Sequence, residues 1–62
     1  MTFLLVAYLF LNDGTVVTDR FPHAATSMEA CQTLGKQKVL EMRGRHADST
    51  NGLYMCIAEN PA

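Results

Sequence analysis

The chain has 62 residues, which suffices for one domain and is too short for two, because so short a chain hides only about 60% of its unfolded surface. Apolar residues make up 48% of it, which indicates a folded globular protein. The net charge of -1 provides no bulk attraction to nucleic acid or to an anionic membrane. We expect one domain over residues 1–62, with a core small enough to need a cross-link, a metal or a partner subunit.

The first element is an unbroken apolar run from Phe3 to Leu11. Nine residues fall well short of the roughly 20 that a helix needs to span a bilayer. No Lys or Arg precedes the run and no small-x-small cleavage pattern follows it, so a secretory signal fits poorly. We expect a buried strand in a cytoplasmic protein. The alternative is that the run is an uncleaved export signal of a periplasmic or cell-envelope protein.

A turn follows the first run, where Asp13 and Gly14 favour a two-residue type I′ hairpin loop. This loop length predicts that Leu11 pairs with Val16 and that the register continues from there.

The second strand is expected from Thr15 to Phe21, where apolar and polar residues alternate, and Pro22 is expected to end it. Thr26 with Glu29 three residues later forms a capping-box pattern that predicts a helix start, with Ser27 as the alternative cap.

Apolar and small residues recur at helical spacing after this cap, so we expect them on one core-facing stripe. Gly35 lies in the middle of the stripe, which predicts a close approach of the helix to the sheet. Leu40 lies off the stripe and is a candidate contact outside the monomer core. The stripe comprises Met28, Cys31, Gly35, Val39 and Met42, with Leu34 beside it.

Gly44 is expected to end the helix, and the polar segment from Arg45 to Gly52 to form a flexible loop. The third strand is expected from Leu53 to Glu59, followed by a fraying tail, Asn60-Pro61-Ala62.

These elements predict an α+β domain of ββαβ order, with a three-stranded antiparallel sheet ordered 2-1-3 and one helix packed on one face. The first strand is apolar on both faces, so it belongs in the centre. One helix covers only one face, and the other face remains apolar. We therefore expect this second face to bind a second subunit, as a homodimer, or a partner protein. The interface candidates are Leu53, Met55, Ile57 and Leu40.

The two cysteines, Cys31 on the helix stripe and Cys56 in the third strand, come together if they share a face. A disulfide between them would stabilise the fold by about 3 kcal/mol. The cytoplasmic location favours two buried free thiols instead, with the bridge as the alternative.

Other chemistry has little support in the sequence. Cys31, Cys56, His23 and His46 lack the close spacing of zinc modules, so no metal is expected. We expect no cofactor, no small-molecule substrate and no enzyme activity, because no phosphate loop or nucleophile motif is present and buried thiols are inert. Four cations near the helix end could contact phosphate, but the helix dipole also favours cations there, so nucleic-acid binding is only a third hypothesis. These cations are Lys36, Lys38, Arg43 and Arg45.

The layout resembles short proteins of bacteriophages and prophages, which share an apolar first strand, a small-residue helix with one Cys and a last strand with a second Cys. The matching segments are 3–11, 27–31 and 54–57. The resemblance implies a protein that binds and modulates a host protein. The leading hypothesis is therefore a small non-enzymatic interaction module, and the alternative is a disulfide-stapled envelope protein.

Overall fold

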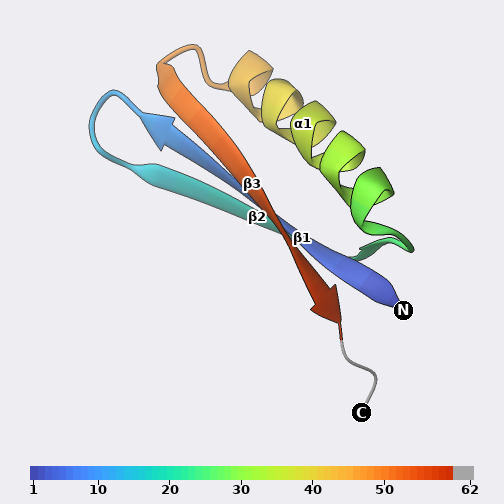
Figure 1. Cartoon of the computed structure of the whole chain (residues 1–62). Coiled ribbons are helices and arrows are strands. Elements are labelled where there is room, and N and C mark those ends of the chain that lie inside the picture. Colours follow the sequence, from blue (N-terminus) through green and yellow to red (C-terminus); the bar gives the residue numbers. More distant parts are fainter. Residues whose placement is uncertain (60–62) are drawn as a thin grey trace.

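A computed structural model describes residues 1–59 of the chain, and the expected tail at 60–62 lies outside the described residues. The element order is ββαβ, which confirms the predicted fold class (Figure 1). The strands form one antiparallel sheet in the order β2-β1-β3, and the helix α1 lies along one face of it. The elements are β1 (Thr2–Leu11), β2 (Val16–Ala25), α1 (Met28–Arg45) and β3 (Ser49–Glu59).

The core lies between α1 and the central strand β1. Side chains on a strand alternate between the two faces, and the odd-numbered residues of β1 point toward the helix. Leu5 and Leu9 are fully buried there, and α1 packs on them through Cys31 and Met42. Of the predicted stripe, Met28 is exposed and does not contribute to the core, because it lies at the very start of the helix.

The β1–β2 hairpin has a three-residue loop in place of the predicted two-residue loop. The Gly14 N–H donates to the Leu11 carbonyl, and Gly14 itself adopts a φ of 88°. The side chain of Asp13 accepts the Thr15 N–H at 2.9 Å, which stabilises this longer turn. A turn followed by a left-handed glycine is the usual three-residue hairpin connection.

The predicted register is consequently wrong by one residue. Phe10 pairs with Val16, and Leu9 pairs with Val17. A one-residue slip moves every β2 side chain to the other face, so Val17 and Phe21 lie on the helix side.

The second strand also continues past Pro22 and ends at Ala25, four residues beyond the predicted end. Proline is tolerated here because β2 is an edge strand, whose outward backbone groups need no partner in the sheet. An irregularity in the pairing occurs at this point, and His23 takes a φ of 55° within it.

The helix begins at Met28 with Ser27 as its cap, so the alternative cap is correct and Thr26 is not the cap. The Ser27 hydroxyl accepts the Ala30 N–H at 3.1 Å. Gly44 lies inside the helix, which ends one residue later than predicted at Arg45.

Two glycines let the helix approach the sheet. A Cβ atom on Gly35 would lie 2.6 Å from Cγ of the Tyr54 ring, and one on Gly52 would lie 2.7 Å from a methyl carbon of Val39. The predicted role of Gly35 in close packing is therefore confirmed.

The third strand begins at Ser49, so the predicted flexible loop over 45–52 is wrong. Only residues 46–48 separate helix from strand. Asn51 pairs with Phe10 and Gly52 with Leu9, which places this turn-like dipeptide inside the ladder. The local pattern Asn51-Gly52 favours a turn, but the glycine is present because a side chain there would collide with Val39. Such a contact cannot be inferred from neighbouring residues.

Candidate interaction surface

Cys31 and Cys56 form a disulfide that joins α1 to β3, with their Cα atoms 6.2 Å apart. The prediction of two free thiols is wrong, and the alternative is correct. The bridge joins cysteines that are 25 residues apart in the chain. For a loop of this length, the lost entropy of the unfolded chain corresponds to about 3 kcal/mol of stabilisation. Bridged sulfurs are neither nucleophiles nor thiolate ligands. Within residues 1–59 no group of three His, Cys, Asp or Glu side chains could hold a metal ion.

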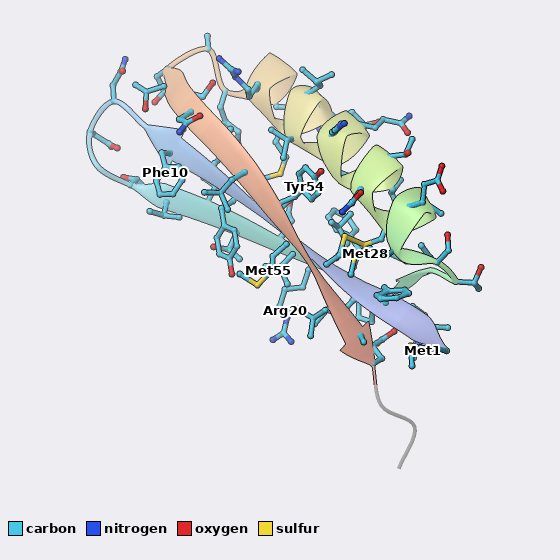
Figure 2. All side chains as sticks on the ribbon, viewed as in Figure 1. Met1, Phe10, Arg20, Met28, Tyr54 and Met55 are labelled. Carbon is cyan, nitrogen blue, oxygen red and sulfur yellow. A yellow bond between two sulfur atoms is a disulfide. The ribbon has the colours of Figure 1, made fainter. Side chains whose placement is uncertain are left out.

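The sheet face opposite the helix carries the predicted interface residues of β3. Leu53, Met55 and Ile57 are 42%, 47% and 43% exposed. They lie opposite Tyr8, Val6 and Leu4 of β1 in the register, and cross-strand partners share a face. Figure 2 shows Met55 and Phe10 on the side of the sheet away from α1, whereas Tyr54 lies between sheet and helix.

We call this surface the open face. The sequence pattern predicts its β3 residues and does not indicate those of the other two strands. Alternation in antiparallel strands would have revealed the β1 members, but the β2 member depended on the hairpin register. The apolar members are Leu4, Val6, Tyr8, Phe10, Val16, Leu53, Met55 and Ile57.

Arg20 is the charged residue in the middle of the open face. It lies on the edge strand β2 opposite Val6, and its side chain extends away from the helix (Figure 2). Val6 is only 6% exposed although no helix covers it, so its neighbours on β2 and β3 already shield the centre of the face. The charge therefore lies toward the β2 side, whereas the β3 side of the face is apolar from Leu53 to Ile57.

Leu40, the fourth predicted interface residue, does not belong to the open face. It is 67% exposed on the outside of α1 and borders an apolar groove between the helix and β3. The predicted set thus divides between two surfaces of the molecule.

The four helix cations do not form one patch. Residues seven apart share a helix side, whereas residues two apart point about 200° apart. Lys36 and Arg43 therefore lie on one flank and Lys38 and Arg45 on the other. Lys38 also contacts Glu41 at 3.4 Å and lies 5.3 Å from the Phe21 ring centre. Each flank of the helix therefore carries two positive charges, fewer than the number of phosphate contacts that nucleic-acid-binding proteins make.

A polar cluster closes the end of the sheet where β1 begins. Glu59 accepts hydrogen bonds from the Thr2 hydroxyl at 2.7 Å and from the His23 N–H at 3.1 Å. The Thr2 hydrogen bond is the main reason that the pKa of Glu59 is lowered, and the nearby His23 side chain lowers it further. No sequence pattern indicated this cluster, because it depends on the irregularity after Pro22.

Comparisons with known proteins give no relative: no family model, no curated protein and no solved structure matches the chain. Within residues 1–59, no helix is both long enough and apolar enough to cross a membrane. The candidate site therefore rests on the geometry of this molecule alone.

Proposed function

We propose that this chain is a small non-enzymatic interaction protein that forms a homodimer through the open face. The observation that carries the proposal is the exposed apolar row of β3, three large side chains each more than 40% exposed. Scattered apolar residues on a surface are ordinary, but a contiguous apolar sheet face is typical of an interaction site.

The size of the open face favours a weak, reversible dimer. Three strands about 4.8 Å apart and about seven residues long give a flat footprint of roughly 300 Å². The accessible area of the side chains exceeds this footprint, so two protomers bury about 600–1,000 Å² in total. This is below the roughly 1,200–2,000 Å² that stable interfaces bury and is in the range of weak, transient contacts.

The position of Arg20 favours one arrangement of the two sheets. A two-fold axis parallel to the strands places β2 of one protomer over β3 of its partner. A two-fold axis that is parallel to the sheet and perpendicular to the strands places β2 of one protomer over β2 of its partner. The two Arg20 side chains then lie close together, which is unfavourable for like charges. The first arrangement lays the aliphatic stem of Arg20 on the partner's uncharged β3 row and leaves its guanidinium at the rim.

Sedimentation velocity over a range of protein concentrations tests the dimer. The mass should rise from one chain to two with increasing concentration. Met55→Lys should weaken the dimer about tenfold or more, because it buries a charge in the interface. Met28→Lys is the matched control, since Met28 is 43% exposed, close to the 47% of Met55, and lies outside the open face.

A protein that stays monomeric at millimolar concentration would refute the homodimer. Equal weakening by the two lysine variants would also refute it, because the effect would then reflect charge and not the surface. Circular dichroism on both variants establishes that the fold is retained.

The resemblance to small phage proteins extends the proposal to a host protein as a further partner of this module. The dimer and the host protein would then compete for the open face, or use separate surfaces of the chain.

The disulfide supports a second candidate, a stapled protein of the periplasm or cell envelope. Structural disulfides persist mainly in oxidising compartments. Fractionation of the native cells, followed by intact-mass measurement with rapid thiol blocking, distinguishes the two. Oxidised protein in the envelope fraction supports the second candidate, whereas reduced protein in the cytosol contradicts it.

A further inference from the structure

The two edges of the sheet differ sharply. The β2 edge carries Asp19, Arg20, Pro22 and a pairing irregularity, all features that prevent another strand from adding. The β3 edge has neither charge nor proline from Ser49 to Ala58. Its register with β1 is uninterrupted from Asn51 to Glu59. A long, regular, apolar edge of this kind readily accepts another strand.

The hydrogen-bond alternation identifies the backbone groups that face this edge. The Leu11 N–H donates to the Thr15 carbonyl, so odd-numbered residues of β1 bond to β2 and even-numbered ones to β3. Their β3 partners are Asn51, Leu53, Met55 and Ile57. The intervening residues therefore direct their N–H and carbonyl groups outward. Consistently, the Gly52 N–H takes the Asn51 side-chain oxygen as its acceptor at 2.9 Å.

A groove of about 510 Å³ runs beside this edge, between α1 and β3. Side chains on a strand added to β3 would alternate between this groove and the extension of the open face. Leu40 lies at the rim of the groove, and 67% of its surface is exposed to solvent. The groove is lined by Lys36, Val39, Leu40, Gly52, Leu53 and Tyr54.

Among the residues that line the groove, the charged one is Lys36. Lys36 and Arg43 flank Leu40 on the same side of the helix, four residues before it and three after it. Among the described residues neither makes an ion pair. The neighbouring stretch of β3 from Ser49 to Ala58 has no carboxylate to offset them.

We infer that the β3 edge binds an extended peptide segment of a partner protein, antiparallel to β3, with an apolar residue between two acidic ones on its groove side. The apolar side chain fills the groove beneath Leu40, and the acidic residues pair with Lys36 and Arg43. Main-chain hydrogen bonds to Gly52 and Tyr54, the outward-facing residues beside the groove, supply the strand addition. A second copy fits this edge less well, because β3–β3 pairing about a two-fold axis would bring the basic flanks of the two helices together. This site shares Leu53 with the open face, but it uses the backbone edge of β3 and the groove under the helix, so it does not depend on the dimer.

The test uses a capped peptide, acetyl-Thr-Glu-Val-Leu-Val-Glu-Thr-amide, titrated into isotope-labelled full-length protein and followed by NMR. The glutamates and the leucine of this probe share one side. We expect shifts centred on residues 52–54 and slower amide exchange at Gly52 and Tyr54. A peptide with lysines for glutamates should bind about tenfold more weakly, the change expected for about 1.4 kcal/mol. A peptide N-methylated at the leucine should not bind.

Protein variants provide the matched controls. Leu40→Glu and Lys36→Glu should each weaken the glutamate peptide, and Gln37→Glu on the outer side of the helix should not. All three positions are exposed, so the fold persists.

Three results would overturn the inference: no binding at millimolar peptide, equal binding of the N-methylated peptide, or shifts confined to the open face. Protection of the β3 edge amides that rises with protein concentration without peptide would also overturn it, since the occupant would then be a second copy. The dimer test with Met55→Lys reads a different surface, so the two proposals fail independently.

Discussion

The two faces of the sheet are formed by the same three strands and carry similar side chains, yet only one of them is covered by the helix. On the covered face, Leu5 and Leu9 of β1 are fully buried. On the open face, Leu53 and Ile57 of β3 remain 42% and 43% exposed. The difference lies in what the helix adds, because two glycines and a disulfide hold α1 close to one side only. Hydrophobicity alone therefore does not define the core of so small a domain; the placement of its single helix and the central position of β1 decide which side chains are buried.

The largest expected difference between the two faces is in the free energy of unfolding lost when a leucine on each face is replaced by alanine. Leu9→Ala should destabilise the fold by about 3 kcal/mol, because it removes a fully buried side chain and leaves a cavity. Leu53→Ala should cost about 1 kcal/mol or less, because that side chain is already half in water. Urea denaturation below the dimer dissociation constant measures both, so that association does not contribute.

Leu9→Ala could remove most of the stability of a domain this size, so Leu9→Val and Leu53→Val form a milder pair. The first should cost about 1 kcal/mol and the second close to nothing. Equal costs on the two faces would contradict the assignment of a single core.

The disulfide is the next test of the comparison, because it ties the helix to the covered face. Reduction of the native protein should lower the free energy of unfolding by about 3 kcal/mol, following the 25-residue separation of the cysteines. The double variant Cys31→Ala with Cys56→Ala should lose at least as much, since the fully buried Cys31 sulfur is also removed. Denaturation curves with and without reductant give both values. An unchanged midpoint on reduction would mean that packing alone holds the helix.

The fold could be predicted from the sequence because its signals are local. The apolar run, the Asp13-Gly14 turn and the helical stripe each reflect the conformation of a few neighbouring residues. The register could not, because Asp13 also accepts the Thr15 N–H and thereby lengthens the loop by one residue. Likewise, the start of β3 depends on Gly52 fitting under Val39, a contact 13 residues away in the chain. A side-chain hydrogen bond within the turn decided the first outcome, and long-range packing decided the second.

The candidate surface was predictable in part for the same reason. Alternation placed Leu53, Met55 and Ile57 together, and the structure confirms that they share the face away from the helix. Leu40 was correctly placed outside the core, but its link to a groove beside β3 needed the helix position. The bridge between Cys31 and Cys56 was sterically foreseeable. The spacing of the two cysteines allowed a disulfide, whereas the expected cytoplasmic location favoured free thiols, and the structure has the disulfide.

The smallest expected effect concerns the polar end of the sheet, where Glu59 receives hydrogen bonds from Thr2 and His23. These contacts lower the pKa of Glu59 from its ordinary value of 4.5, so folding favours the ionised carboxylate. The stabilisation is therefore fully present above pH 4.5 and is lost as the pH falls through the lower folded value. Glu59→Gln retains an oxygen acceptor and removes the charge. It should be slightly less stable than the native protein at pH 6, and the difference should shrink as the pH falls below 4.5.

Thermal unfolding at a series of pH values measures this convergence. Glu41→Gln is the control, because it removes one negative charge from an exposed position on the helix, paired only with Lys38 at 3.4 Å. Its difference from the native protein should be small at every pH. If Glu59→Gln and the native protein differ equally at pH 3 and pH 6, the shape of the glutamine amide and not the lost charge is responsible, and the ionised cluster does not hold β3 to the ends of β1 and β2.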